Sequence, residues 1–288
     1  MATGDFHLHS AASDGVRSPT WVVETAAARG VRHLALTDHD TTAGLDEAKR
    51  AGERLGLGFV PGIEISVVHQ GRDVHLLGFG IDVGSVALQD FLSWQRDGRV
   101  RRMEATVELL AKHGVTIDFE RVRAIAGGAS IGRPHLARAM MEAGYVGSVQ
   151  EAFDVWLAEG QPGYVGRERL APREAIDLIH RAGGVAFAAH PVFLGDDYPE
   201  RIRELAPMGL DGLETYYKHY EPETVAAHEE LATSLGLAMS GGSDYHGLGN
   251  PNDREIGDIP FPDEAVEAFL AFLARRGVHM TQAGGTPC

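Results

Sequence analysis

Cysteine is almost absent from this sequence, and long apolar runs are absent altogether. The single cysteine among 288 residues is Cys288, which excludes a disulfide framework and argues against a catalytic thiol. No apolar stretch approaches the roughly 20 residues that a membrane-spanning helix needs. The opening residues, MATGDFHLHS, contain neither a basic segment nor the apolar core of a signal peptide. These shortages lead us to expect a cytoplasmic protein without a membrane partner.

Basic residues are the second shortage. The 26 Lys and Arg residues face 41 Asp and Glu residues, and the net charge is −15 at pH 7. Long duplex nucleic acid requires a basic groove along its phosphates, so this balance argues against such a partner. A small phosphorylated substrate remains compatible with the charge, because bound cations reverse the local field. Hydrophobic residues form 44% of the chain, which suffices for one large domain, with or without an insert.

Two parts of the chain alternate between strand and helix patterns. Apolar segments that run into polar residues predict strands at DFHLHS, VRHLALTDHD, GFVPGIEISVVH and RDVHLLGFGI, and again at VAFAAHP, DGLETYY and LAMSGGSDYHG. Helical periodicity follows most of these segments. Repeated strand–helix units with reactive residues at the strand ends predict an α/β barrel that carries its site at the carboxyl ends of the strands.

The middle of the chain has a different pattern. From about Ser85 to Glu168 almost every segment has helical periodicity, beginning with VALQDFLSWQRDGRVRRMEATVELLAKHG, which predicts one long helix or two. We therefore expect a discontinuous barrel domain made of residues 1–98 and 168–288. Residues 99–167 would form a small all-helical insert that covers the active site.

Side chains that bind metals gather where the predicted strands end. They are His7, His9, Asp14, His39, Glu64, His75, His190, Asp244 and His246. Side chains alternate along a strand, so His7 and His9 share a face, as do Asp244 and His246. Each motif alone has an ordinary interpretation, such as a half-buried strand histidine. Together they predict a multi-metal centre, because burying unpaired imidazoles and carboxylates is costly without an ion or a partner.

The mixture of ligands indicates hydrolytic chemistry. Imidazoles combined with carboxylates suit Mn²⁺, Fe²⁺ or Zn²⁺ and disfavour a pure Mg²⁺ or Ca²⁺ site. Two such ions lower the pKa of a bridging water and neutralise phosphoryl oxygens, so a Ser or Cys nucleophile is not required. Nearby serines are expected in turns or beside the ligands, and Asp38 and Asp40 are expected to support His39. The serines are Ser10, Ser13, Ser66 and Ser243.

At these positions the chain resembles the PHP (polymerase and histidinol phosphatase) family of metal-dependent phosphoesterases. The resemblance covers nearly the whole chain outside the insert and implies a distorted (β/α)7 PHP barrel with two or three divalent ions. It is carried by His7-Leu8-His9 with Asp14, Thr37-Asp38-His39, Gly62-Ile63-Glu64, His75, Ala189-His190-Pro191 and Ser243-Asp244-Tyr245-His246.

The resemblance also implies a division of the ligands. One ion would be held by His7, His9, Glu64 and Asp244, and Glu64 would bridge to a second ion at His75 and His190. Asp14, His39 and His246 would form a third site, or the same side chains would face the substrate phosphate. The implied catalytic residues, acting through metal-activated water, are His7, His9, Glu64, His190 and Asp244. Mn²⁺ is the ion expected first, with Fe²⁺ or Zn²⁺ as alternatives.

One branch of the family resembles the chain more closely. It comprises the 3′,5′-nucleoside bisphosphate phosphatases, some of which are also described as 5′-to-3′ exoribonucleases on short RNA. The likeness lies in Thr37 to Ala48 and in the insert segment Ile131-Gly132-Arg133-Pro134-His135-Leu136-Ala137. It implies a phosphoric monoester hydrolase that removes the 3′-phosphate of nucleotides such as adenosine 3′,5′-bisphosphate.

Recognition of the substrate depends on residues outside the metal motifs. A helix that begins near His135 offers an anion site, to which Arg133 adds a planar fork, so Arg133, Pro134 and His135 are predicted to bind the non-reacting 5′-phosphate. The alternative is an ordinary surface arginine beside a helix-starting proline. Lys218 and His219 lie where a barrel loop would reach the substrate. Tyr216, Tyr217 and Tyr245 could stack on a base, although packing in the core is the simpler interpretation.

Three further functions remain open on the sequence alone. They are a 5′-to-3′ exonuclease on short oligonucleotides, a histidinol-phosphate-type phosphatase and an inactive metal-binding module. The complete set of ligands argues against the inactive module, and the net charge argues against long nucleic acid.

Overall fold

The computed structural model describes residues 1–127, 131–166, 169–218, 220–249 and 254–281. Its contacts divide the chain into two compact units, which are Met1–Gln89 together with Arg169–Cys288, called here the barrel unit, and Asp90–Glu168, called the insert. The boundary at Asp90 lies earlier than the expected residue 99. The reason is that α3 (Val86–Lys112) is one continuous helix, so no break in its pattern marks the start of the insert.

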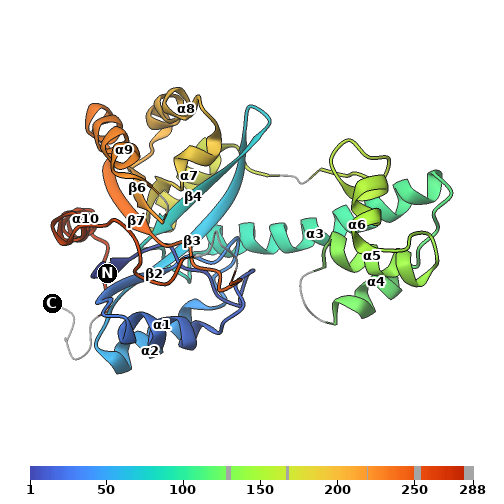
Figure 1. The fold of residues 1–288 in the computed structure, drawn as a ribbon, viewed down its shortest axis with the longest axis horizontal. Coiled ribbons are helices and arrows are strands. Elements are labelled where there is room, and N and C mark those ends of the chain that lie inside the picture. The colour runs from blue at the N-terminus through green and yellow to red at the C-terminus, as the bar shows by residue number, and fades with distance from the viewer. Residues whose placement is uncertain (128–130, 167–168, 219, 250–253, 282–288) are drawn as a thin grey trace. The chain divides into compact units, whose positions relative to one another are not determined.

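A mixed sheet of seven strands in chain order forms the barrel unit (Figure 1). The strands are β1 (Gly4–Asp5), β2 (His33–Leu36), β3 (Gly58–His69), β4 (Arg72–Phe79), β5 (Val185–Ala188), β6 (Gly212–Tyr217) and β7 (Ala238–Gly242). The β3–β4 and β4–β5 pairs are antiparallel, and every other neighbouring pair is parallel. This antiparallel interruption distorts the barrel.

The first and last strand segments approach each other and nearly close the sheet. The Phe6 N–H donates to the Gly241 carbonyl over 3.0 Å, and Leu8 forms a parallel bridge with Tyr245. The predicted distorted sevenfold α/β barrel is therefore confirmed. Because these bonds lie at the segments that carry the predicted ligands, closure of the sheet also brings the two ends of the ligand set together.

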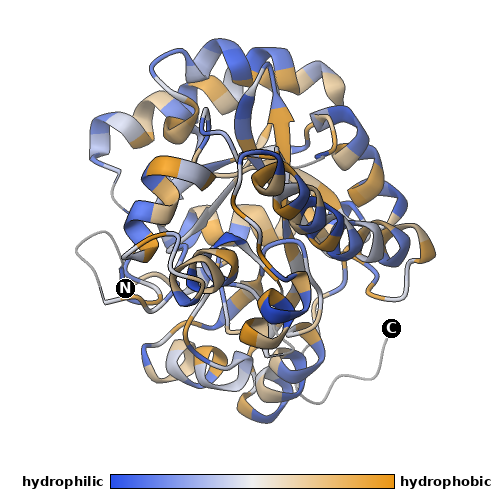
Figure 2. Ribbon diagram, turned by 90° about the vertical axis from the view of Figure 1, so that its right-hand side faces the viewer, coloured by the Kyte–Doolittle hydropathy of each residue, from blue (hydrophilic) through white to orange (hydrophobic). Residues whose placement is uncertain are grey.

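Helices follow the strands of the barrel unit, as the alternating pattern predicts. They are α1 (Pro19–Ala28), α2 (Leu45–Leu55), α7 (Pro172–Arg181), α8 (Tyr198–Leu205), α9 (Pro222–Leu235) and α10 (Asp263–Arg275), with short 3₁₀ turns η2 (Pro191–Leu194) and η3 (Ala206–Met208). Helix α1 begins at Pro19, and the Ser18 side chain accepts a hydrogen bond from the Trp21 N–H. Hydrophobic and hydrophilic residues alternate along the helices, as expected for helices with one buried face (Figure 2).

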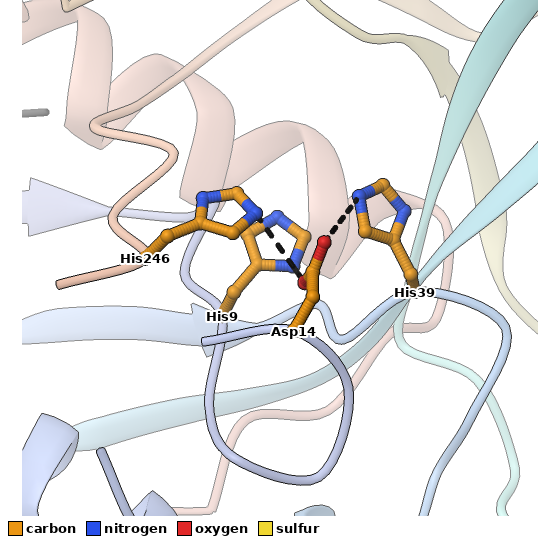
Figure 3. A group of neighbouring side chains, drawn as sticks. All are labelled: His9, Asp14, His39 and His246. Atoms are coloured by element: carbon orange, nitrogen blue, oxygen red, sulfur yellow. Dashed lines mark ion pairs between the residues drawn. The ribbon is translucent and has the colours of Figure 1, made fainter. Parts of the chain in front are cut away.

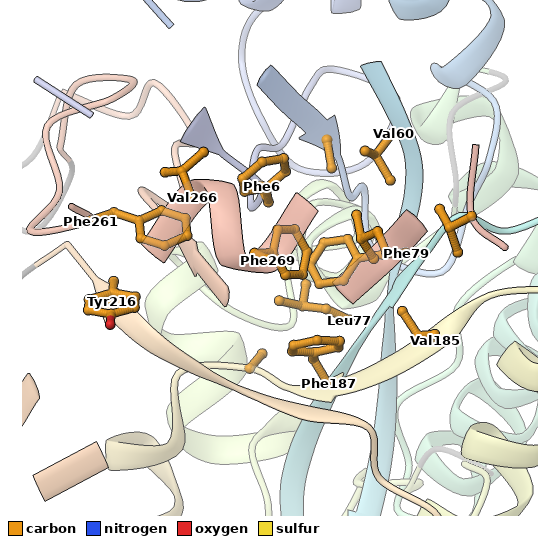
Figure 4. Close-up of a cluster of buried hydrophobic side chains, with 14 of the residues drawn as sticks. Phe6, Val60, Leu77, Phe79, Val185, Phe187, Tyr216, Phe261, Val266 and Phe269 are labelled. Carbon is orange, nitrogen blue, oxygen red and sulfur yellow. The ribbon is translucent and has the colours of Figure 1, made fainter. Parts of the chain in front are cut away.

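A cluster of phenylalanine rings packs the barrel core and includes Phe6, the residue before His7 (Figure 4). Phe6 contacts Phe269 edge-to-face, with ring centroids 4.6 Å apart, and Phe269 lies 5.3 Å from Phe79 in the same manner. Such aromatic pairs contribute about 0.5–1.5 kcal/mol each beyond the burial of their surface. Phe6 and Leu8 are fully buried, and their side chains point to the face opposite that of His7 and His9. The packing of Phe6 and Leu8 therefore fixes the backbone that carries the two histidines.

The insert has a core of its own. Its elements are α3 beyond Gln89, α4 (Phe119–Ala126), α5 (Arg133–Glu142), α6 (Val149–Ala152) and the π-helical turn η1 (Phe153–Leu157). Their buried residues form a separate apolar cluster that includes Met103, Leu110, Leu136, Met140 and Leu157. Among the described residues, no helix combines the length and the hydropathy needed to cross a membrane.

Candidate metal centre

The nine predicted ligands lie together, because hydrogen bonds extend the pairing of the strands past their ends. The Asp244 N–H donates to the His7 carbonyl over 2.8 Å, and the Ala189 N–H donates to the His75 carbonyl over 3.0 Å. His39 forms a parallel bridge with Glu64. Segments far apart in sequence are thus fixed in register, and their side chains converge on a common region.

A first group consists of His7, His9, Glu64 and Asp244, whose potential ligand atoms all lie within 4.8 Å of one another. Glu64 Oε2 is 3.3 Å from His7 Nε2 and 3.2 Å from His9 Nε2. Asp244 Oδ1 is 3.3 Å from His7 Nε2 and 3.0 Å from His9 Nε2. Ligand atoms on a tetrahedral ion with bonds of about 2.0–2.1 Å are separated by roughly 3.3 Å, so the spacing fits one small cation.

Several of these atoms lack the hydrogen bonds that buried polar atoms normally make. His7 Nε2, His9 Nε2 and Glu64 Oε2 are buried and have no hydrogen-bond partner. Buried polar atoms without partners are costly, and each needs an explanation. A divalent cation explains all three at once, because it accepts lone pairs that converge on one point. The residues present therefore fit a metal ion.

A second group forms on the other oxygen of Glu64. Its Oε1 lies 2.9 Å from His75 Nδ1 and 3.2 Å from His190 Nε2, while Oε2 also lies 3.0 Å from His39 Nδ1. His39, Glu64 and His75 together make a set that could hold an ion. The two oxygens of one carboxylate thus face two groups of imidazoles, which is the arrangement that a bridging ligand requires.

The third group contains Asp14, His39, His246 and also His9 (Figure 3). Asp14 lies between two rings, with Oδ2 at 3.8 Å from His39 Nε2 and Oδ1 at 3.4 Å from His246 Nε2. The Asp14 side chain is 55% exposed, whereas the ligands of the first group are almost fully buried. A neutral imidazole offers one lone pair, so His9 can serve only one of the two groups to which its nitrogens are near.

Charges within the cluster strongly shift the pKa values of its members. Burial alone would raise the pKa of Glu64, but the imidazoles of His39, His7 and His75 hold that pKa well below its ordinary value. Burial also opposes ionisation of Asp244, and there too the neighbouring His7 and His9 keep the pKa low. Burial lowers the pKa of His39 to about 4, whereas at His9 the contacts with Asp244 and Glu64 outweigh burial and raise the pKa to about 9. The buried carboxylates thus need positive charge beside them, which protons on the imidazoles or a divalent cation can supply.

Two predicted ligands have unusual backbone conformations. His190 has φ +27° and Asp244 has φ +48°, in the left-handed region that residues other than glycine rarely adopt. Asp40, next to His39, has φ +50°. Such conformations cost about 1–3 kcal/mol each and persist where surrounding contacts enforce them. The fold therefore holds these ligand residues in backbone conformations that lower its stability and fix the orientation of their side chains.

Partners of Asp244 fix which of its oxygens faces the histidines. The Tyr217 hydroxyl donates to Asp244 Oδ2 over 2.7 Å, and Lys218 Nζ donates to the same oxygen over 3.1 Å. Oδ1 is left to face His7 and His9. The sequence suggested that Lys218 reaches the substrate and that Tyr217 packs or stacks. The structure holds both against this carboxylate, and Tyr217 is buried, in agreement with packing. A contact of Lys218 with the substrate stays a prediction, and His219 lies outside the described residues.

The sequence predicted that the acidic residues flanking His39 support that histidine, and in the structure they hydrogen-bond to the surrounding loops. Asp38 Oδ1 accepts from the Ser10 N–H and from the Ser13 hydroxyl, each over 2.7 Å. These bonds fasten the loop that carries Asp14. Asp40 Oδ1 accepts from the Ser66 N–H over 3.2 Å. Ser10, Ser13 and Ser66 therefore have structural partners.

Two residues near the cluster were missed at the level of sequence. Glu214 in β6 is fully buried, and its Oε1 lies 2.9 Å from His7 Nδ1. A carboxylate inside the apolar strand DGLETYY was a readable signal for a buried partner. Phe193 in η2 is 67% exposed, and its ring centroid lies 5.1 Å from that of His190. Nothing in the sequence distinguished this ring from an ordinary surface residue.

The predicted phosphate-binding residues have partners within the insert. Arg133 Nη1 donates to the Leu157 carbonyl over 2.9 Å, and its guanidinium lies 5.6 Å from the Phe153 ring centroid. His135 Nδ1 accepts from the Gly132 N–H over 3.0 Å, and Pro134 occupies the first turn of α5. Arg133 is thus more than a free surface arginine. Its binding of phosphate, with Pro134 and His135, stays a prediction.

Comparisons with known proteins agree on one family. The sequence profile of the PHP domain matches residues 5–170. The chain is 36% identical over 267 residues to a 3′,5′-nucleoside bisphosphate phosphatase from Chromobacterium violaceum, covering 90% of this chain and 93% of the relative. It is 34% identical over 247 residues to the 5′-3′ exoribonuclease Rnm of Salmonella typhimurium, covering 84% of each.

A solved structure from Bifidobacterium adolescentis, described as a candidate metal-dependent phosphoesterase, has a similar fold. It superposes with a TM-score of 0.72 at 33% identity and covers 93% of this chain and 96% of its own. Fold, ligand cluster and sequence likeness therefore lead to the same conclusion: the chain belongs to the PHP family and is a phosphoesterase.

Proposed function

We propose that this phosphoesterase hydrolyses the 3′-phosphate of nucleoside 3′,5′-bisphosphates, such as adenosine 3′,5′-bisphosphate, to give a 5′-nucleotide and phosphate. The observation that carries the proposal is the double-faced Glu64 carboxylate, with imidazoles near each of its oxygens. A carboxylate shared in this way suits a centre of two ions, and a centre of two ions suits phosphate esters. The likeness to a bisphosphate phosphatase over 90% of this chain supports the choice of substrate.

The predicted ligands divide among two or three cations. His7, His9, Glu64 and Asp244 would hold one cation, and Glu64 with His75 and His190 or His39 would hold a second. Asp14, His39 and His246 would hold a third or face the phosphate. When bound, such ions supply an activated water and neutralise the charge of the phosphate. Mn²⁺ is the ion we propose first, with Fe²⁺ or Zn²⁺ as alternatives.

An exposed aromatic ring beside the centre supports a nucleotide rather than a sugar phosphate or histidinol phosphate. Phe193 is 67% exposed and meets Tyr217 perpendicularly, with ring centroids 5.8 Å apart. The Tyr217 hydroxyl donates a hydrogen bond to Asp244, which fixes the ring against which Phe193 packs. Stacking of a base on an aromatic side chain contributes about 1–3 kcal/mol. We propose that the base of the substrate stacks on Phe193.

A second function, 5′-to-3′ hydrolysis of short oligonucleotides, is favoured by the openness of the third group. Asp14 is more than half exposed, so a longer substrate can extend on this side. The similarity to an exoribonuclease supports the same reading. The net charge of −15 restricts this activity to short chains, because each added phosphate increases the repulsion.

The test is a substrate series measured with metal-reconstituted protein. We would compare adenosine 3′,5′-bisphosphate, adenosine 3′-monophosphate, histidinol phosphate and 5′-phosphorylated oligoribonucleotides of increasing length. Release of phosphate is measured separately from release of mononucleotides, and Glu64→Gln protein serves as the blank. The proposal requires the bisphosphate to have the highest kcat/KM. Faster turnover of oligonucleotides that increases with length would replace it with the exonuclease, and preference for histidinol phosphate would refute both.

A further inference from the structure

We propose that Glu214 is a positioning residue that presents His7 to one ion and His190 to another, so that one buried carboxylate prepares two metal groups at once. The inference rests on the metal centre of the proposed function. Glu214 is fully buried in β6 and stands next to an irregularity in the pairing of β6 with β7, between Glu214 and Tyr216. Such irregularities redirect side chains.

The first contact of Glu214 fixes the tautomer of His7. Its Oε1 lies 2.9 Å from His7 Nδ1. A carboxylate oxygen accepts hydrogen bonds, so Nδ1 carries the proton and Nε2 keeps its lone pair. His7 Nε2 is the atom that lies 3.3 Å from both Glu64 and Asp244 and has no hydrogen-bond partner. Glu214 therefore directs the free lone pair of His7 into the first group.

The second contact of Glu214 fixes the backbone of His190. Its Oε2 accepts a hydrogen bond from the His190 N–H over 2.6 Å. His190 has φ +27° and ψ 61°, a conformation that a histidine does not keep without restraint. With its N–H held in this way, the ring of His190 meets Glu64 Oε1 at 3.2 Å. The same carboxylate therefore directs the second group.

The contacts of the two oxygens can be separated by the substitution Glu214→Gln. The amide oxygen can still accept from the His190 N–H. The amide nitrogen then faces His7 Nδ1 and can only donate to it, which moves the His7 proton to Nε2 and removes the lone pair from the first group. Glu214→Gln should therefore impair His7 and spare His190, whereas Glu214→Ala should impair both.

The experiment measures metal binding and the tautomer, and it uses no substrate. Zinc affinity is determined by chelator competition, and the protonation of His7 is read from long-range ¹H–¹⁵N spectra of histidine-labelled, zinc-loaded protein. Glu229→Gln is the matched control, because Glu229 accepts from the Tyr216 hydroxyl and touches none of the predicted ligands. Loss of a residue that orients a metal ligand typically lowers affinity 10- to 100-fold.

The expected result for wild-type protein is a protonated Nδ1 and a metal-bound Nε2 on His7. Glu214→Gln should weaken the first zinc by 10- to 100-fold, and Glu229→Gln should leave it unchanged. Wild-type affinity in Glu214→Gln overturns the proposal. An unprotonated Nδ1 in wild-type protein does the same, even if no variant folds. A protein that binds zinc in this manner but hydrolyses no phosphoester refutes the proposed function and leaves the role of Glu214 intact.

Discussion

The barrel unit and the insert differ in their buried polar atoms, their backbone conformations and their charge. Among the described residues, the buried side-chain atoms without hydrogen-bond partners all belong to the barrel unit, as do the left-handed residues other than glycine. The insert has an apolar core and helices that start at ordinary caps, such as Asp118 and Ser148. Asp90–Glu168 contains 11 acidic and 10 basic residues, so nearly all of the net charge of −15 belongs to the barrel. The difference teaches that strain and unpaired polar atoms mark the unit that carries the candidate metal ligands.

The largest effect should follow removal of the shared carboxylate. Glu64→Ala is expected to lower the metal content and to reduce kcat by at least about a thousandfold, equivalent to about 4 kcal/mol. The reason is that both oxygens of Glu64 contact candidate ligand groups. Elemental analysis and phosphate release measure the two effects. Glu120→Ala, an exposed change in the insert, is the control, and full metal content with near-normal turnover in Glu64→Ala would contradict the assignment.

Removal of the metal should destabilise the barrel unit and leave the insert unchanged. Exhaustive chelation is expected to abolish activity, and Mn²⁺ is expected to restore it. A ligand present at about 100 times its Kd stabilises a fold by about 2.7 kcal/mol, so the metal-free barrel should also lose protection from amide hydrogen exchange. Protection in α4 and α5 of the insert should be unchanged. Equal loss in both units, or full activity with no metal found, would break the comparison.

The arginine of the insert should act on one substrate more than on another. Arg133→Ala is expected to lower kcat/KM for a 3′,5′-bisphosphate by roughly a hundredfold, corresponding to about 2–3 kcal/mol, and to have much less effect on a 3′-monophosphate. Because Arg133 also bonds to Leu157, stability should fall by about 1 kcal/mol. Arg121→Ala, which removes an exposed pair with Glu142, should be neutral. Equal losses on the two substrates would assign Arg133 to folding or to the reacting phosphate.

A smaller, base-specific effect is expected in the barrel unit. Phe193→Ala should raise KM for adenosine 3′,5′-bisphosphate by about 10-fold, because stacking of one base contributes about 1–3 kcal/mol. Ribose 3,5-bisphosphate, which has no base, should be hydrolysed as by wild-type protein. Val192→Ala, at the neighbouring partly exposed position, is the matched control. If the two substrates respond alike, Phe193 does not recognise the base.

The smallest effect concerns stability alone and involves a histidine outside the predicted ligand set. Burial lowers the pKa of His228 from 6.5 to about 4. As the pH falls from 6.5 towards 4, His228 becomes protonated in the unfolded chain but stays neutral in the folded chain. The free energy of unfolding therefore decreases over this range. His228→Leu should reduce the loss of stability between pH 7 and pH 5 by roughly 1–2 kcal/mol. Denaturant titrations at the two pH values measure it, and an unchanged pH dependence would refute the assignment.

The sequence carried most of the candidate site, because strand periodicity is a local property. His7 and His9 could be placed on one face, and apolar flanks indicated that each ligand follows a buried strand. The apolar flanks of Glu214 signalled a buried carboxylate, but its contacts with His7 and His190 could not be foreseen, because they depend on the pairing of β6 with β7 and on the backbone of His190. The start of the insert was also hidden, since α3 passes through the boundary without a break. Residue types and their spacing were enough to predict the ligands. Features that depend on strand register or on long-range contacts could not be predicted from the sequence.

The pairing of β4 with β5 has a consequence for the order in which the chain folds. These strands are hydrogen-bonded neighbours, for example at Leu76 and Ala188, although the whole insert lies between them in sequence. Closing a long flexible loop costs entropy, and a segment that has already folded shortens the loop that remains. The insert has its own core and is synthesised before β5, so it can fold first and bring the two strands together. Asp244 and His246 follow β7, so the candidate metal centre is completed only after the chain has been made as far as His246.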